Sequence, residues 1–247
     1  AIKELFYCEE FFKKGDERSK QRNFGLKKAR CPFVLFVDAD MELSSNMLKE
    51  CIQIMNKNPK VVLIVTSHYP PNLGGVESHL QALVTSLTKK GWEVIISTYQ
   101  PLAYSKKAPK VERSKSLIIC RQNWLGFNIV HMLTPYPALE FLYLFPGLFI
   151  VTFKAMINHH KKISIIHCQG LVPTVVGILI AKLFSKRVIS STHNLYFFPA
   201  KSLYSWVTRL IFNSTTKVLV PTEIAKKELI GIGVQESKIG FFKYWID

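Results

Sequence analysis

The sequence pattern between residues 61 and 91 predicts a strand, a glycine loop and a helix. Five apolar residues at 61–65 are followed by the turn residues Tyr69-Pro70-Pro71-Asn72 and then by Gly74-Gly75. A short apolar run bounded by turn residues is typical of a strand buried on both faces of a parallel sheet. Beyond the glycines, apolar residues recur at helical spacing, and Gly91 marks the helix end. Glycines allow close backbone approach and a helix N-terminus offers N–H groups, so the loop suits a phosphate or sugar hydroxyl, although a tight turn alone would carry the same glycines.

The rest of the chain alternates predicted strands with predicted helices. Strands are expected at 93–98, 116–120, 163–166, 187–192, 217–220 and 238–242, and helices at 139–158, 173–184, 202–212 and 222–230. A basic stretch at 101–114 is expected to be a mobile loop. Such units build an α/β fold with a Rossmann-like parallel sheet and helices on both faces. Ligands then bind at the carboxyl ends of the strands, where the Gly74-Gly75 loop, the 167–170 turn and His193 are expected to meet.

The longest apolar stretch, at 141–153, is interrupted by Pro146-Gly147 and followed by Lys154. A bilayer span needs about 20 apolar residues, so this segment is too short and too broken to cross a membrane comfortably. Two interpretations are left. A helix buried in the core is favoured, because every face of the segment is apolar, and a helix lying in a membrane surface is the alternative.

Charge and cysteine content narrow the choice of partners. The chain carries 33 basic and 17 acidic residues, a formal net charge of +16, which favours nucleotides or anionic lipid heads as partners. The basic residues lie in scattered pairs without a motif that reads bases, so we expect no nucleic-acid partner. Five cysteines without a C-x-x-C pair are typical of reduced thiols in a cytosolic protein.

The first block of the chain ends at the Lys57-Asn58-Pro59-Lys60 boundary, which divides residues 1–60 from 61–247. An apolar run at 33–37 ends in Asp38-Ala39-Asp40. Two carboxylates at i and i+2 just beyond a strand point the same way, so they can share a divalent cation that bridges to a diphosphate. A turn before a helix that starts near Ser44 is the other interpretation.

The segment GDERSKQRNFGLKKARCPFVLFVDADMELSSNML resembles the middle of a family 2 glycosyltransferase domain, which has the GT-A fold. The matching pieces are Arg22-Asn23-Phe24-Gly25 and the D-x-D at Asp38 and Asp40. The resemblance implies that these two aspartates hold Mn²⁺ or Mg²⁺ and the donor diphosphate. It covers about residues 10–58, a partial GT-A-like α/β segment without the family's earlier nucleotide-binding strands or later catalytic base.

Residues 61–247 resemble the N-terminal half of a family 4 glycosyltransferase, a GT-B enzyme. The match lies in LIVTSHYPPNLGGVESHLQALVTSLTKKGWEVIIST, IIHCQG, VISSTHN and TTKVLVPTEIAKKELIGIGVQESKIGFFKYWID. In that family two Rossmann-like domains face each other across a cleft. The N-terminal domain takes the acceptor and the C-terminal domain binds the nucleotide sugar. The resemblance implies transfer of a sugar from a nucleotide-diphosphate sugar to a hydroxyl of a lipid-linked or glycan acceptor, in glycolipid, cell-surface polysaccharide or glycan synthesis.

The resemblance also assigns roles to single residues. Gly74 and Gly75 form the loop near the donor phosphates and the acceptor, and Glu77 is the acidic residue common after these glycines. His193 corresponds to the active-site histidine that contacts the transferred sugar, and Asn194 follows it in the T-H-N element. This half of the enzyme is expected to need no metal cofactor.

Other histidines have plainer interpretations. His167 matches the first histidine of an H-x-H pattern, but Gln169 stands in the second position. His193 itself could be a structural hydrogen-bonding histidine at a strand end. His68 and His79, on either side of the glycine loop, are expected to be surface or loop-packing residues.

Two alternatives to a transferase are left open. The +16 charge and the apolar 141–153 segment would also suit a non-catalytic module that binds an acceptor or an anionic membrane surface. A GT-B sugar-nucleotide epimerase would share the two-domain fold. We expect a cytoplasmic protein, peripheral at the inner face of the membrane, and a chain that is inactive without a C-terminal GT-B half.

Overall fold

The computed structural model describes residues 61–102, 107–125, 129–133, 136–193 and 202–242. The chain divides into two units, residues 1–58 and 59–247, and the described residues all belong to the second. The GT-A-like segment with Asp38 and Asp40 therefore lies outside the described residues, and its metal site stays a prediction.

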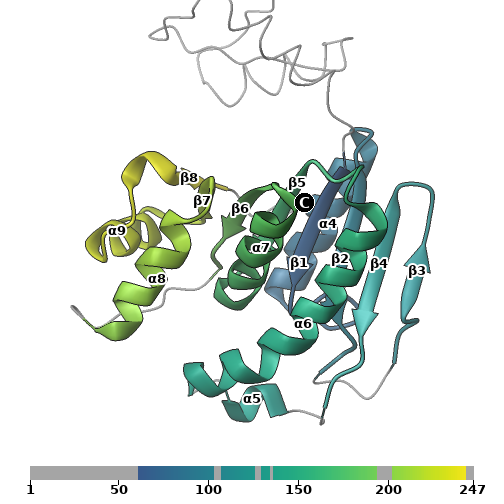
Figure 1. Cartoon of the computed structure of the whole chain (residues 1–247), viewed down its shortest axis with the longest axis horizontal. Helices are drawn as coiled ribbons and strands as arrows, with labels where there is room; N and C mark the ends of the chain where they lie inside the picture. The colour runs from purple at the N-terminus through teal and green to yellow at the C-terminus, as the bar shows by residue number, and fades with distance from the viewer. Residues whose placement is uncertain (1–60, 103–106, 126–128, 134–135, 194–201, 243–247) are drawn as a thin grey trace, which may run out of the picture. The chain divides into compact units, whose positions relative to one another are not determined.

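The described residues form an α/β fold around one eight-stranded sheet with the order β3-β4-β2-β1-β5-β6-β7-β8 (Figure 1). Every neighbouring pair is parallel except β3 with β4. This confirms the Rossmann-like α/β prediction, with one antiparallel edge strand added. The strands are β1 (Val61–Thr66), β2 (Glu93–Tyr99), β3 (Val111–Arg113), β4 (Leu117–Gln122), β5 (Ile165–Gln169), β6 (Arg187–Ser191), β7 (Lys217–Val220) and β8 (Ile239–Phe241).

Strand β3 corrects the expectation of a loop over residues 101–114. Val111 pairs with Cys120 and Arg113 with Ile118, so β3 closes one edge of the sheet beside β4. A strand of three residues with a basic end carries too little hydrophobic alternation to be recognised in the sequence. The extended conformation of β3 is held by its hydrogen bonds to β4.

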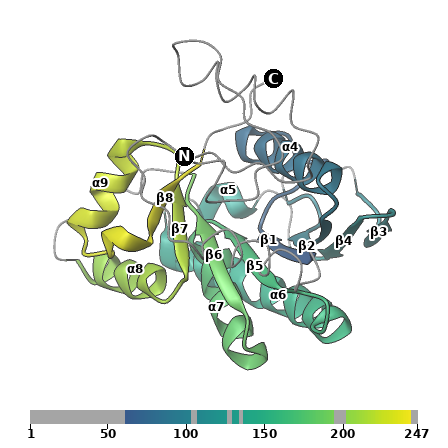
Figure 2. The same cartoon turned by 90° about the horizontal axis from the view of Figure 1, so that it is seen from above.

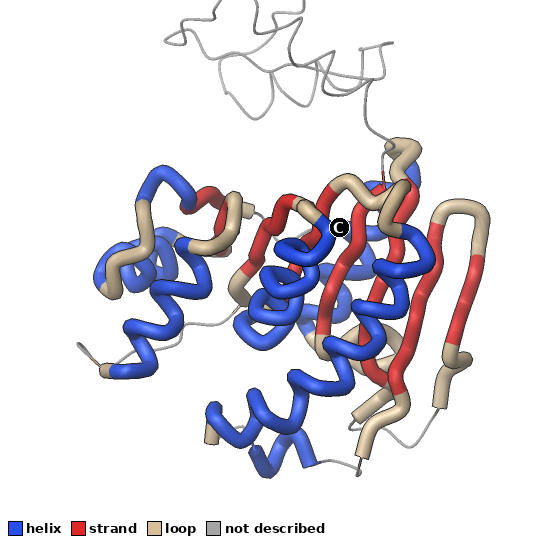
Figure 3. The backbone as a smooth tube through the Cα atoms, in the orientation of Figure 1, coloured by secondary structure: helices blue, strands red, loops and turns tan. Residues whose placement is uncertain are grey.

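Helices cover both faces of the sheet, as predicted. They are α4 (Gly75–Lys89), α5 (Ile129–Leu133), α6 (Pro137–His159), α7 (Leu171–Phe184), α8 (Leu203–Asn213) and α9 (Glu223–Gly231), with a short 3-10 turn at Glu236–Lys238. Helix α4 lies on one side of β1 and β2, and α6 and α7 lie on the other (Figures 2 and 3). Helices α8 and α9 begin at capping residues, because Ser202 Oγ accepts from the Ser205 N–H and Thr222 Oγ1 from the Ala225 N–H.

Strand β1 is buried on both faces, as its unbroken apolar run predicted. Val61, Leu63 and Val65 pack in the core on the α6 and α7 side. Val62 and Ile64 pack with Leu80 and Val84 of α4. Each residue of the run therefore contributes to one of two cores, which explains why the strand carries no polar alternation.

Helix α6 is longer than the sequence suggested. It runs for 23 residues straight through Pro146, so it covers the predicted helix at 139–158, and the Pro146-Gly147 interruption of the apolar stretch does not break it. Pro146 is exposed, and Gly147 lies against Tyr99 and Trp124, where an added Cβ would come within 2.6 Å of either ring. Within the part of the chain that the structure describes, α6 is the one helix long and apolar enough to cross a membrane by length and composition.

The order of the strands creates one crevice. The chain runs from β1 outward to β2 and β4, then returns through α6 to β5 on the opposite side of β1. The direction of winding thus reverses between β1 and β5. In open parallel sheets, ligands bind at the carboxyl ends of the strands at such a reversal. The loop after β1 and the ends of β5 and β6 are therefore the segments that form the candidate site.

Candidate functional site

Three strand ends bring the candidate residues together. Thr66 at the end of β1 is in register with Gln169 of β5, and Gln169 is in register with Ser191 of β6. His167 lies inside β5 rather than in a turn, since the strand extends to Gln169 and only Gly170, at φ +89°, changes direction. His193 follows β6 by two residues. His167 and His193 therefore lie at the same edge of the sheet, as predicted.

A chain of hydrogen bonds joins the two histidines through Gln169. The His193 Nε2–H donates to Gln169 Oε1 over 2.7 Å, and the Gln169 Nε2–H donates to His167 Nε2 over 3.2 Å. The Ser191 hydroxyl lies 2.7 Å from the same His167 nitrogen and also donates to it. Because two donors meet at His167 Nε2, that nitrogen carries no proton. The amide then fixes the proton of neutral His193 on Nε2 and leaves Nδ1 as its acceptor nitrogen.

Both histidines are neutral at physiological pH. Burial, followed by repulsion from His79, lowers the pKa of His193 to about 4. Burial, followed by repulsion from His193 and His79, lowers the pKa of His167 to about 4 as well. A neutral imidazole with so low a pKa is a weak base at pH 7. His193 is therefore suited to hold a hydroxyl by hydrogen bonds and poorly suited to remove its proton.

His79 was expected to be a surface or loop-packing residue, and the structure instead buries it at this site. It is 6% exposed, and its ring meets the His193 ring edge-on at a centroid distance of 5.5 Å. The Phe242 ring lies 5.1 Å from His79 and 5.3 Å from His193. Burial lowers the pKa of His79 too. Its position next to Leu80 and one turn before Leu83 and Val84 on α4 was the sequence signal for an inward-facing residue.

The glycine loop places the N-terminus of α4 at the same edge. Gly74 precedes the helix in an extended conformation, and no side chain caps this helix end. The half-buried Glu77 folds back over Gly74, since a Cβ added there would lie 2.4 Å from Glu77 Oε2. A Cβ at Gly75 would meet nothing within 4 Å. The backbone of Gly75 is therefore open to a ligand, while the Glu77 carboxylate favours the helix by lying at its positive end.

Asn194 lies outside the described residues, so its predicted role is untested. Among the residues that the structure describes, no group of three or more His, Cys, Asp or Glu side chains is arranged to hold a metal ion. Sequence reasoning missed Gln169 as the connecting residue, and it missed Ser191 and Phe242. These residues meet His167 or His193 only through sheet pairing and the fold.

Comparison with known proteins identifies the family. The sequence model described as Glycosyltransferase Family 4 matches residues 73–244, which is more than half of the chain. The model described as Glycosyl transferase family 2 matches residues 10–129. The second match runs beyond the expected 10–58 segment into strands β1 to β4, which form one sheet with β5 to β8. A comparison with curated proteins gave no significant match.

Solved structures resemble the second unit in fold. Sucrose-phosphate synthase from Thermosynechococcus elongatus is 16% identical at a TM-score of 0.54, over 74% of this chain and 48% of that protein. The catalytic domain of Starch Synthase IV from Arabidopsis thaliana is 14% identical at 0.53, over 77% of this chain and 52% of that one. Anabaena HepE in complex with UDP-glucose is 10% identical at 0.50, over 76% and 44%.

These structural neighbours are GT-B glycosyltransferases, and at such identities the likeness establishes the fold. The chain spans about half the length of each of these three proteins. The family match rests on the sequence itself and includes the glycine loop, β5, His193 and the elements after it. The chain belongs to glycosyltransferase family 4.

Proposed function

We propose that the second unit is the acceptor-side half of a GT-B glycosyltransferase that transfers a sugar from a nucleotide-diphosphate sugar to a hydroxyl of a lipid-linked or glycan acceptor. The single observation that carries the proposal is the His193–Gln169–His167 chain at the carboxyl ends of β5 and β6, where the His193 ring meets His79 of α4. Family membership supports the reaction class.

The fold neighbours support the donor class. HepE was crystallised with UDP-glucose, and Starch Synthase IV with ADP and acarbose. UDP-glucose and ADP both contain a nucleoside diphosphate. An open helix N-terminus can stabilise such a group through its N–H groups and its partial positive charge. In this chain that group would lie against the Gly75 end of α4.

In the proposed mechanism each side chain has a distinct task. The backbone at Gly75 and the dipole of α4 stabilise the charge that develops on the departing diphosphate. Gln169 holds the His193 proton on Nε2 and so fixes the orientation in which the imidazole contacts the transferred sugar. His193 stays neutral because burial lowers its pKa, and it orients the sugar without taking part in proton transfer.

The proposal is tested by product analysis with the full-length protein that contains this chain. The protein is incubated with radiolabelled UDP-, ADP- and GDP-sugars and with lipid or glycan hydroxyl acceptors. Label should appear in an acceptor product, with release of the nucleoside diphosphate. Formation of an epimerised nucleotide sugar in place of a transfer product would show an epimerase and contradict the proposal.

A further inference from the structure

Helices α6 and α7 expose an apolar surface on the side away from the sheet, which we call the α6–α7 face. It consists of Leu142, Ile150 and Ile157 of α6 and Leu179 and Leu183 of α7, each between 40% and 67% exposed. The α6 members lie eight and seven residues apart and form one stripe along the helix. No charged residue interrupts α6 from Phe141 to Phe153. Among the residues that the structure describes, these side chains therefore form an exposed apolar surface.

The inner face of α6 fixes how this helix can meet a membrane. Leu148 and Met156 are fully buried, and they pack with β1 and β5 in the core on this side of the sheet. The helix cannot leave that core to cross a bilayer without exposing these side chains. Its length and composition suit a span, but its packing allows only contact along its outer stripe.

A basic groove runs beside the stripe, between α6 and the β3–β4 edge. Its volume is about 370 Å³, and its lining includes Lys110, Arg113, Arg121, Lys154 and His159 but no acidic residue. Arg121 forms an ion pair with the neighbouring Glu112 over 3.0 Å. Burial lowers the pKa of His159, and repulsion from Arg113 and Lys162 lowers it further, so the groove cations at neutral pH are Lys110, Arg113 and Lys154 together with the ion-paired Arg121. Burial also raises the pKa of the Cys120 thiol in the lining, so the thiol adds no compensating charge.

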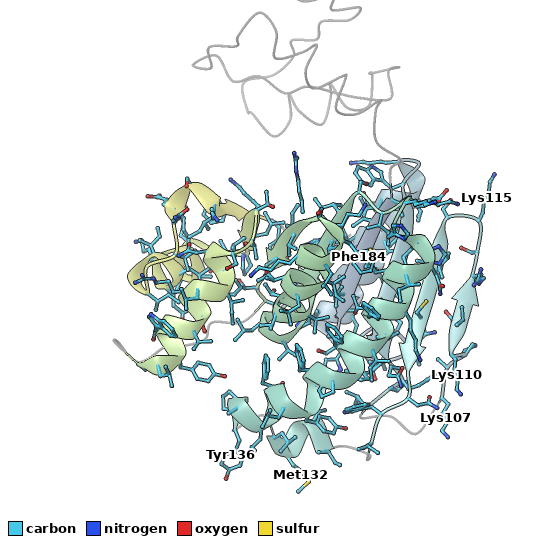
Figure 4. The ribbon with its side chains drawn as sticks, in the orientation of Figure 1. Lys107, Lys110, Lys115, Met132, Tyr136 and Phe184 are labelled. Atoms are coloured by element: carbon cyan, nitrogen blue, oxygen red, sulfur yellow. The ribbon has the colours of Figure 1, made fainter. Side chains whose placement is uncertain are left out.

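The cations continue along this edge of the sheet. Lys107, Lys110 and Lys115 project from the β3 edge, while Met132 and Tyr136 project at the end where α5 and α6 begin (Figure 4). Met132 and Tyr136 are 73% and 59% exposed. Apolar and cationic side chains therefore occupy neighbouring parts of the surface. Lys154 connects the two parts, because it lies four residues after Ile150 of the α6–α7 face and its side chain lines the basic groove.

We propose that the α6–α7 face and the basic groove dock this unit on an anionic lipid bilayer. The apolar stripe enters the interface between head groups and acyl chains, and Lys110, Arg113 and Lys154 bind lipid phosphates. The occupant follows from charge: the chain carries +16, so a second copy would bring groove cations against like charges. A bilayer containing anionic lipids offers the apolar and the negative surface together. The inference is independent of the proposed sugar transfer.

Vesicle co-sedimentation tests the charged part of the proposal. The chain should bind vesicles of phosphatidylcholine with phosphatidylglycerol, release them as salt is raised, and bind phosphatidylcholine alone weakly. The triple variant Lys110→Gln, Arg113→Gln and Lys154→Gln should bind about 100-fold more weakly, from about fivefold for each cation. The matched control is the triple variant Lys89→Gln, Lys90→Gln and Lys227→Gln. It also removes three positive charges, but at the end of α4 and on α9. Its binding should stay within a few-fold of that of the unmodified chain.

A second pair of variants tests the apolar part. Ile150→Ser with Ile157→Ser should lower vesicle affinity at least about 10-fold, because the apolar area that enters the interface is lost. Ile224→Ser with Ile230→Ser makes the same chemical change on exposed residues of α9 and should leave affinity unchanged. Circular dichroism melting verifies that all variants are folded.

The proposal is overturned if the control variants lose as much affinity as the test variants, or if vesicles without anionic lipid bind equally well. It is also overturned if the unmodified chain sediments as a dimer that the Ile150→Ser and Ile157→Ser pair converts to a monomer, since the face would then join two copies. No sugar donor is present in these measurements, so their failure leaves the proposed sugar transfer standing, and failure of the transfer assay leaves the docking face standing.

Discussion

Gln169 is the residue on which the geometry of the site depends. Its amide accepts from His193 and donates to His167, so one side chain sets the proton positions of two neutral imidazoles. A histidine in its place, as in the H-x-H pattern, would reach these partners differently, because a neutral imidazole carries its donor and acceptor nitrogens on different sides of a rigid ring, whereas the amide oxygen and NH₂ group share one carbon.

Replacing Gln169 with Leu should change the tautomer of His193. Without the amide oxygen, the Nε2–H proton loses its acceptor, and the imidazole redistributes its proton between Nδ1 and Nε2. The measurement is a long-range ¹H–¹⁵N NMR correlation of the histidine rings, which distinguishes the two tautomers. An unmodified chain in which His193 already carries its proton on Nδ1 would show that the hydrogen-bond directions are wrong.

The Gln169→Glu variant serves as the matched electrostatic change. A carboxylate between the two rings favours the imidazolium form, so the pKa of both His193 and His167 should rise. Recording the same ¹H–¹⁵N correlation over a range of pH measures the pKa of each histidine. Values that stay at about 4 would show that the residue 169 side chain does not lie between the two rings.

The stability of the unit should fall as pH decreases from 6.5 to about 4. His167 and His193 have a pKa of about 4 in the fold and 6.5 as model groups, so the unfolded chain binds protons first in this range. Each contributes at most about 1.4 kcal/mol per pH unit to the loss, less where water reaches the ring. Urea unfolding across this range measures it. The His193→Gln variant should show a shallower decline, and an equal slope would contradict the buried neutral state.

At the scale of elements, the sequence predicts what local chemistry determines. The all-apolar run of β1, the four residues of β7 and the capped starts of α8 and α9 are confirmed to within two residues. Each depends on periodicity or on a capping residue within its own segment. Strand β3 depends on its pairing with β4, which is why the pattern missed it, whereas α6 was predicted at 139–158 and extends only two residues before and one residue beyond that range. The sequence predicted which edge of the sheet holds the candidate site. It could not predict the contacts among His167, Gln169 and Ser191, because these depend on the register between β5 and β6.

Helix α7 packs on β5 at a glycine, which gives a sharp test of that contact. A Cβ at Gly177 would lie 2.2 Å from the buried Cys168 Sγ. Gly177→Ala should therefore lower the free energy of unfolding by about 1–3 kcal/mol, since overpacking outweighs the better helix propensity of alanine. Thermal and urea unfolding measure the loss.

Two further variants verify the cause. Cys168→Ala combined with Gly177→Ala removes the sulfur that clashes and should recover most of the lost stability. Gly75→Ala adds the same methyl group where nothing lies within 4 Å, so the melting temperature should stay unchanged. In the full-length protein the same Gly75→Ala variant should reduce sugar transfer, because the methyl group occupies the space that the diphosphate would use. Equal destabilisation by both alanines would refute the packing explanation.

At the scale of the molecule, the second unit carries two surfaces with separate tasks. The carboxyl edge of the sheet holds His193 and the glycine loop, while the proposed docking surface lies on the outer side of α6 and α7. A unit docked along α6 would keep its carboxyl edge available to a donor-binding domain. The chain spans about half the length of these GT-B neighbours.

The central claim is that His193 orients the sugar in the transfer reaction. The most direct measurement compares kcat/KM for sugar transfer by the full-length protein with that of its His193→Ala and His160→Ala variants, at matched melting temperatures. His193→Ala should lose about 100-fold or more, as when one hydrogen bond to a transition state is removed, while His160→Ala, half-buried just beyond the end of α6 and away from the strand carboxyl ends, should keep full activity. A folded His193→Ala variant with unchanged kcat/KM would contradict the claim.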